Sequence, residues 1–247
     1  MRKIHAFVAC LFVTALVVVG CSSIESASQL AKPNAWILND GSVNNTSKQV
    51  IQHCNRSVNR GVLLTFDDQG TDQQIYDILE RLRHYNLRAA FFPTGKWAQN
   101  HLYLIERMKA EGHMIGNHTY SHVNLKQLSD TNESAFYGEI HPVEGVVNTQ
   151  PMLLRPPYGE GAYDTLMRSR LTEKKIQVCT WTVDTLDWKG DSVEVMMGRL
   201  RNGYVSTPPL GPDGVVLMHM GGQYTPRLID AIVDYLDQMG WKYDQGA

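Results

Sequence analysis

The sequence has no excess of positive charge. Its 23 lysines and arginines are opposed by 25 aspartates and glutamates, which gives a formal net charge of −2 at pH 7. A nucleic-acid-binding protein needs a basic face that displaces counterions from phosphates. The charge balance therefore argues against a nucleic-acid partner.

Apolar runs long enough to cross a membrane are also lacking. The apolar stretch from Ala6 to Gly20 follows Arg2 and Lys3. It is too short to span a hydrocarbon core of ~30 Å comfortably. Basic residues followed by a short apolar run are typical of an export signal, which we expect over residues 1–20.

A lipid attachment signal closes this segment. Val18-Val19-Gly20-Cys21 resembles the lipobox of bacterial lipoproteins, in which the signal is cut before the cysteine and that cysteine is lipidated. An ordinary secretory signal with a chance cysteine is the alternative. Because several acyl chains anchor a protein stably, we expect an exported protein of the cell envelope, held on a bacterial membrane through Cys21.

Cysteine is scarce, with four in the chain. Cys10 leaves with the signal and Cys21 is consumed by lipid, so Cys54 and Cys179 remain. An exported location permits a disulfide between them. Cys179 lies within an expected strand, however, and Cα separation cannot be read from sequence. We expect two buried free thiols, with the disulfide as the alternative.

The remaining composition fits one globular domain. The chain has 247 residues, of which 43% are hydrophobic and 19% charged, enough to bury a substantial core. Residues 21–57 are rich in Ser, Asn, Gln and Lys, which predicts a flexible tether. We expect the folded domain over residues 58–247, with no internal repeat. We also expect the protein to be monomeric.

Within this domain, short apolar runs alternate with longer amphipathic stretches, a pattern that favours βα units on a parallel sheet. We expect six units and a possible seventh between Tyr204 and Asp213, in a distorted or incomplete (β/α) barrel rather than a two-sided open sheet. The expected strands are Val62–Phe66, Arg88–Phe92, His113–Asn117, Met152–Pro156, Ile176–Val183 and Val215–His219. The expected helices cover residues 72–85, 96–111, 133–147, 162–174, 192–202 and 226–239.

Polar residues follow or end most of these strands. In a βα barrel the carboxyl ends of the strands converge on one face, where active sites of such folds are built. The residues concerned are Asp67, Asp68, His118, Arg155, Asp184, Asp187 and His219. We therefore expect them to share one cleft.

A metal site is the simplest interpretation of three of these positions. His118 and His122 are four residues apart, a spacing that places two imidazoles within one helical turn. Asp68 adds a carboxylate, which completes a set with coordination positions open for water and substrate. Asp67 is then free to act as a base. Surface histidines on a loop and capping aspartates are the alternatives for each motif alone.

Five motifs together resemble those of polysaccharide deacetylases of the NodB homology type, also called carbohydrate esterase family four. The similarity runs from about residue 60 to residue 240. The motifs, in order, are Thr65-Phe66-Asp67-Asp68, His118-x-x-x-His122, Arg155-Pro156-Pro157-Tyr158-Gly159, Asp184-x-x-Asp187-Trp188 and Leu217-Met218-His219.

The resemblance assigns roles to the acidic pair and its neighbours. Asp67 would be the general base, oriented by Arg155. Asp68, His118 and His122 would hold a divalent ion, usually zinc in this family. The resemblance thus implies zinc-dependent chemistry.

The remaining motifs imply the rest of the reaction. The backbone N–H of Tyr158 would help to stabilise the oxyanion of the tetrahedral intermediate. His219 would be the general acid, steered by Asp187. Trp188 and Leu217 would wall a small pocket for the acetyl methyl group.

Two positions are less defined. Asp184 would support this network through polar contacts with an unidentified partner. Gln69-Gly70 departs from the family, in which many members have Gly-Pro after the two aspartates. We expect the side chain of Gln69 to narrow the rim or touch a sugar.

These observations predict a zinc-dependent hydrolase that removes N-acetyl groups from an amino-sugar polymer, peptidoglycan or chitin-like, in the cell envelope. An O-acetyl esterase acting on xylan or a related polymer is one alternative. A catalytically silent glycan-binding lipoprotein is another, although it predicts the loss of a catalytic residue.

Overall fold

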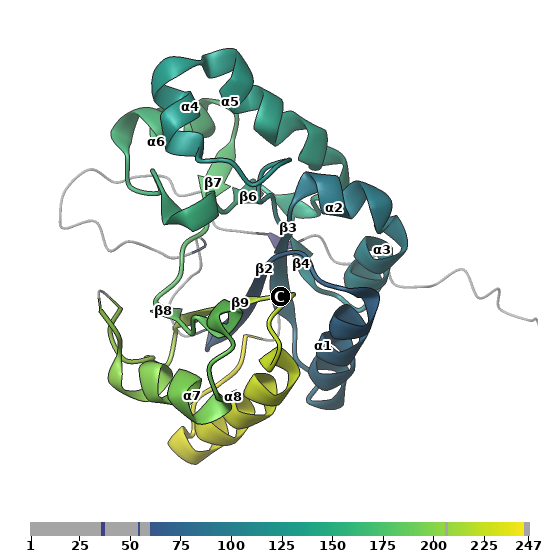
Figure 1. Cartoon of the computed structure of the whole chain (residues 1–247), viewed down its shortest axis with the longest axis vertical. Helices are drawn as coiled ribbons and strands as arrows, with labels where there is room; N and C mark the ends of the chain where they lie inside the picture. The colour runs from purple at the N-terminus through teal and green to yellow at the C-terminus, as the bar shows by residue number, and fades with distance from the viewer. Residues whose placement is uncertain (1–35, 38–53, 55–59, 206, 245–247) are drawn as a thin grey trace, which may run out of the picture. The chain divides into compact units, whose positions relative to one another are not determined.

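A parallel sheet forms the centre of the domain in this computed structural model, which describes residues 36–37, 54, 60–205 and 207–244. Its five strands run in the order β4-β3-β2-β9-β8 (Figure 1). Their bounds are Met114–Ile115 for β4, Ala89–Pro93 for β3, Leu63–Asp68 for β2, Val215–His219 for β9 and Val183–Asp184 for β8.

Two further strands extend this array beyond β4. Strands β6 (Met152–Leu154) and β7 (Ile176–Val178) pair in parallel, and a bridge between Asn117 and Leu154 connects them to the segment that follows β4. In the described chain no strand pairing joins β7 to β8. The seven parallel strands therefore form an incomplete (β/α) barrel, which confirms the expected fold class.

Amphipathic helices cover the strands, and α1 (Asp72–His84) shows how the sequence specifies them. Thr71 caps its first turn in a reciprocal capping box with Gln74. The apolar residues at helical spacing, Ile75, Ile78, Leu79 and Leu82, are buried in the main core. Helix α1 contacts α8 (Thr225–Met239), which in turn contacts α7 (Val193–Asn202).

The remaining helices are shorter. They are α2 (Gly95–Asn100), α3 (Leu102–Ala110), α4 (Leu125–Thr131), α5 (Glu133–Ile140) and α6 (Thr165–Glu173), with 3₁₀ turns η2 (His141–Val146), η3 (Pro157–Gly159) and η4 (Asp187–Lys189). Helices α4 to α6 pack together beside β7 (Figure 1). No helix among the described residues is both long and apolar enough to cross a membrane.

The seventh strand comes from a different place than expected. Residues 176–183 form two strands, β7 and β8, separated by Cys179–Thr182, instead of one. Between Tyr204 and Asp213, the described residues contain only an isolated bridge from Tyr204 to Thr207. The predicted location of an extra unit there was wrong.

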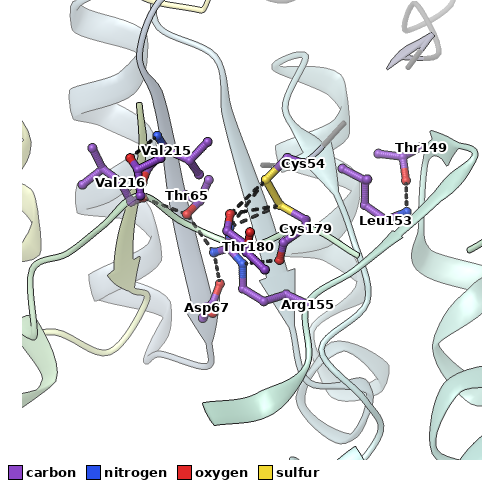
Figure 2. The surroundings of a disulfide bond; sticks show 11 residues. Cys54, Thr65, Asp67, Thr149, Leu153, Arg155, Cys179, Thr180, Val215 and Val216 are labelled. Atoms are coloured by element: carbon purple, nitrogen blue, oxygen red, sulfur yellow. Dashed lines mark hydrogen bonds and ion pairs between the residues drawn. A yellow bond between two sulfur atoms is a disulfide. The ribbon is translucent and has the colours of Figure 1, made fainter. Parts of the chain in front are cut away.

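The expectation of free thiols was also wrong. Cys54 and Cys179 form a disulfide across 125 positions of sequence, and both are fully buried (Figure 2). Cys54 falls within the stretch expected to be a tether, as does β1 (Trp36–Ile37), which pairs in parallel with β5 (Thr149–Gln150). The predicted export signal and Cys21 lie outside the described residues.

Candidate active site

Three side chains with metal-binding atoms converge beside the carboxyl end of β2. One ligand atom from each of Asp68, His118 and His122 lies within 4.8 Å of the others. Asp68 Oδ1 is 3.1 Å from His118 Nε2 and 3.0 Å from His122 Nε2. Burial would raise the pKa of Asp68, but the two imidazoles outweigh it and hold that pKa well below its usual range.

This donor set fits a divalent cation. Asp68 Oδ1 is buried and makes no hydrogen bond among the described residues, although both imidazoles face it. Two imidazole nitrogens and a carboxylate oxygen are ligands that zinc accepts. A cation would satisfy the atom that the protein leaves without a hydrogen bond.

His118 and His122 lie on a loop, so the helical turn expected from their spacing is wrong. Thr119 and His122 have φ angles of 64° and 60°. The loop is held by hydrogen bonds from Thr119 N to Asn117 Oδ1 (2.8 Å) and from His122 N to Thr119 Oγ1 (3.0 Å). His118 Nδ1 donates to the carbonyl of Arg155 at 2.7 Å, which leaves Nε2 directed at Asp68.

Asp67 has a different partner from Asp68, because it pairs with Arg155. The guanidinium Nη1 of Arg155 donates to Asp67 Oδ1 at 2.7 Å (Figure 2). Asp67 Oδ2 lies 3.9 Å from His118 Nε2. Arg155 is fully buried and Asp67 is 3% exposed. Burial lowers the pKa of Arg155, against the attraction of Asp67. The adjacent aspartates thus occupy different environments.

His219 ends β9 opposite the acidic pair. Its Nδ1 donates to Asp187 Oδ1 at 2.7 Å, and its Nε2 lies 4.0 Å from Asp68 Oδ2. Burial would lower the pKa of His219, but Asp187 outweighs it and raises that pKa to about 9. Asp187 thus favours the form of this imidazole in which both ring nitrogens carry a proton.

Asp187 has a further partner that the sequence did not reveal. Thr225 Oγ1, at the start of α8, donates to Asp187 Oδ2 at 2.6 Å, and the backbone N–H of His219 donates to the same oxygen at 2.8 Å. A Cβ on Gly222 would lie 2.1 Å from Thr225 Oγ1, so only glycine fits beside this contact. No motif in the sequence marks Thr225.

Two predicted aromatic site residues are exposed, one beside His122 and one directly after Asp187 in the sequence. Tyr158 has a φ of 62° and is 69% exposed, and its ring lies edge-on to that of His122 at a centroid distance of 4.8 Å. Trp188 is 60% exposed. The Tyr158 ring therefore presents apolar surface to solvent next to His122, one of the proposed metal ligands.

The three other predicted site residues differ in how far their side chains are buried. Leu217 is 4% exposed, whereas Gln69 is exposed. Asp184 Oδ1 accepts from the backbone N–H of Leu186 at 2.8 Å, which supplies the partner that the sequence left open. Burial raises the pKa of Asp184.

Comparison with known proteins places the chain in a family. The polysaccharide deacetylase model matches residues 54–179. A peptidoglycan-N-acetylglucosamine deacetylase of Bacillus cereus is 34% identical over 187 residues, which cover 73% of this chain and 64% of that protein. The chain belongs to the polysaccharide deacetylase family.

Solved structures agree with this assignment. A crystal structure of a peptidoglycan N-acetylglucosamine deacetylase bound to an N-hydroxybenzamide superposes with a TM-score of 0.64 at 32% identity, covering 76% of this chain and 86% of the other. A family pseudoenzyme from Bacillus anthracis also reaches 0.64, at 26% identity, covering 76% and 64%. This chain aligns with 64% of the length of the Bacillus cereus deacetylase, which is somewhat less than two thirds.

Proposed function

We propose that this chain is a metal-dependent hydrolase that removes N-acetyl groups from an amino-sugar polymer, peptidoglycan or chitin-like, in the bacterial cell envelope. The observation that carries the proposal is the convergence of Asp68, His118 and His122 between the Asp67–Arg155 and His219–Asp187 pairs. The relatives named as peptidoglycan deacetylases supply the substrate class.

Asp68, His118 and His122 would hold the cation, with zinc as the first candidate. When bound there, it supplies Lewis-acid polarisation of the acetamide carbonyl. The hydrogen bond from His118 Nδ1 to the Arg155 carbonyl orients His118 so that Nε2 can bind the cation.

Asp67 acts as the general base through Oδ2, because Oδ1 is engaged by Arg155. As the oxygen of a water molecule attacks the carbonyl carbon, Oδ2 takes a proton from it. The backbone N–H of Tyr158 donates to the developing oxyanion.

His219 acts as the general acid through Nε2, because Nδ1 is engaged by Asp187. Nε2 gives its proton to the amide nitrogen as the C–N bond breaks, which releases acetate and leaves a free amine on the sugar. The raised pKa of His219 keeps this proton available at neutral pH.

The rim residues bind the polymer in this proposal. Trp188 and Leu217 bound the space for the acetyl methyl group, and Tyr158 offers its exposed ring to sugars. Asp184 holds the loop that leads to Asp187. Gln69 extends from the rim and contacts the sugar chain. The Gln69→Ala variant should therefore change the kcat/KM for peptidoglycan relative to the kcat/KM for chitin oligomers. An unchanged ratio of these two values would show that Gln69 does not determine specificity.

The decisive assay measures acetate release from N-acetylated peptidoglycan, chitin oligomers and acetylated xylan, each with and without a chelator. We expect release from an N-acetylated polymer that stops on chelation and returns with zinc. Release from xylan alone would identify an O-acetyl esterase. Zinc binding without turnover of any polymer would identify a silent glycan-binding protein.

We also propose that the protein is monomeric and anchored through a lipidated Cys21 after removal of residues 1–20. The support is the lipobox-like sequence Val18-Val19-Gly20-Cys21. Membrane fractionation and the mass of the mature N-terminal peptide test it. A Cys21→Ala protein that stays in the membrane fraction would contradict the anchor.

A further inference from the structure

The disulfide lies against the guanidinium that holds the base. Arg155 Nη2 is 3.3 Å from Cys179 Sγ and 3.8 Å from Cys54 Sγ, and all three side chains are fully buried (Figure 2). None of the proposed chemical steps uses either sulfur.

The donors of Arg155 divide between the base and the cysteine segment. Nη1 donates to Asp67 Oδ1 and to Thr65 Oγ1 (2.8 Å). Nε donates to the carbonyl of Cys179 at 3.2 Å, and Nη2 donates to the carbonyl of Thr180 at 3.3 Å. A buried guanidinium needs such partners for its N–H groups, since leaving them unpaired is costly. Residues 179–180 thus fix the side of Arg155 that faces away from Asp67.

The segment that contains Cys179 and Thr180 belongs to neither β7 nor β8. Cys179–Thr182 connects β7 to β8 at the place where the described barrel has no strand pairing. Its backbone is held at its two ends, by Cys179 N to the Leu154 carbonyl and by Thr182 N to the Val215 carbonyl. The covalent bond to Cys54 adds a third attachment, directly beside the carbonyls that receive Arg155.

Two thiols would not be equivalent to the disulfide at this place. Cys54 Sγ lies 3.3 Å from the Thr180 carbonyl oxygen, the same distance as Arg155 Nη2. Disulfide sulfurs carry no proton, whereas a thiol is a weak donor and would compete with Arg155 for this oxygen. Two unbonded sulfurs also need more room than a disulfide, and closely packed interiors yield space only by shifting neighbours. Here the neighbours are Arg155 and Phe92, whose ring centroid lies 4.3 Å from the guanidinium carbon.

We propose that Cys54 and Cys179, joined as a disulfide, are positioning residues that hold Arg155 in the orientation required to fix Asp67. The catalytic part of this inference rests on the proposed function. The geometric part concerns Arg155 itself and does not depend on which polymer is hydrolysed.

The first test compares kcat and KM of the full chain with those of the Cys54→Ala/Cys179→Ala double variant, using acetate release from N-acetylglucosamine oligomers. We expect kcat to fall about tenfold or more, as small misplacements of catalytic groups cause, with KM within about twofold. Zinc affinity, measured by calorimetry, should stay unchanged. Leu171→Ala is the control, because Leu171 is buried in a separate core cluster and its truncation lowers stability without contact with Arg155.

A double-mutant cycle separates positioning from general stabilisation. In an Arg155→Lys background, loss of the disulfide should cost less in kcat than in the parent, because the residue it positions is already altered. Equal costs in both backgrounds, or an unchanged kcat in the disulfide-free protein, would overturn the proposal. If this double variant does not fold, the Cys54→Ser/Cys179→Ser variant, whose side chains are nearly as large as those of cysteine, provides the same comparison.

A spectroscopic measurement keeps this test independent of the proposed function. The NMR signal of the Arg155 Nε–H, assigned through Arg155→Lys, should shift and exchange faster with solvent in the disulfide-free protein. A signal that does not move shows that the disulfide does not position Arg155, even if no polymer is hydrolysed. A moved signal without turnover by the parent supports the positioning and contradicts only the proposed function.

Discussion

The carbonyl of Arg155 accepts a hydrogen bond from His118 at 2.7 Å, while the side chain of the same arginine donates to Asp67 at 2.7 Å. One residue therefore fixes both a proposed metal ligand and the proposed base. Its backbone and its side chain thus link the two halves of the site through a single residue.

Asp67→Asn should lower kcat for acetate release by about a hundredfold or more, since general-base catalysis contributes on this scale. An amide has nearly the shape of the carboxylate but cannot take the proton. Zinc affinity should change little, because Asp67 is not one of the three converging ligands. A variant that retains more than about a third of the parent kcat would show that another group is the base.

His122→Ala should weaken zinc binding strongly, because it removes one of three ligands. Isothermal titration calorimetry with the metal-free protein measures this directly. The control is His141→Ala, since His141 is exposed and pairs with Glu144 away from the proposed ligands. Equal zinc affinities in the two variants would place the cation elsewhere.

Thr225→Val should lower kcat several-fold, because Asp187 then loses a buried hydrogen bond, which contributes about 1–2 kcal/mol. Thr225→Ser keeps the hydroxyl and should restore most of the rate. Thr172→Val is the matched control, since the Thr172 hydroxyl donates to the Arg168 carbonyl within α6. If Thr225→Ser is as slow as Thr225→Val, the loss comes from packing and not from the hydrogen bond.

Acid should destabilise the fold through His113. Burial, together with the nearby Arg88 and Arg107, lowers the pKa of His113 to about 3. Its unfolded pKa is about 6.5, so below that pH the unfolded chain takes up a proton that the folded chain does not. The stabilising effect of this neutral imidazole is complete above about pH 6.5 and is lost as the pH falls toward 3.

Urea unfolding between pH 7 and pH 4 measures this effect. Below about pH 6, the free energy of unfolding of the parent should fall faster than that of His113→Asn, by about 1.4 kcal/mol per pH unit. The asparagine oxygen can accept from the Ala89 N–H, as His113 Nδ1 does. His84→Asn, which changes an exposed histidine in α1, should follow the parent, and parallel slopes for His113→Asn and the parent would contradict the argument.

Periodicity and turn residues predicted the regular parts of the fold well. Strand β9 has the predicted bounds, Val215–His219, and α8 begins one residue earlier than expected. The expected helix 96–111 is divided at His101, whose φ of −131° interrupts the helical backbone. Helix α4 was missed, because its seven residues are too few to display a convincing period.

The candidate site was predictable where chemistry lies at strand ends and unpredictable where it depends on packing. Asp68 and His219 follow from the parallel arrangement of β2 and β9. The disulfide and Thr225 do not, since each joins segments whose separation in space the sequence does not specify. The loop that carries His118 and His122 depends on residues with left-handed backbone angles, which the spacing of the two histidines does not predict.

The hydrogen bond from Thr225 to Asp187 also concerns the order in which the protein is made. Thr225 opens α8, which follows β9 in the sequence. A growing chain that has just completed His219 already contains both proposed acid–base groups, yet it lacks the hydroxyl that holds Asp187. The proposed acid–base pair is therefore complete only after α8 has been synthesised and has docked beside η4.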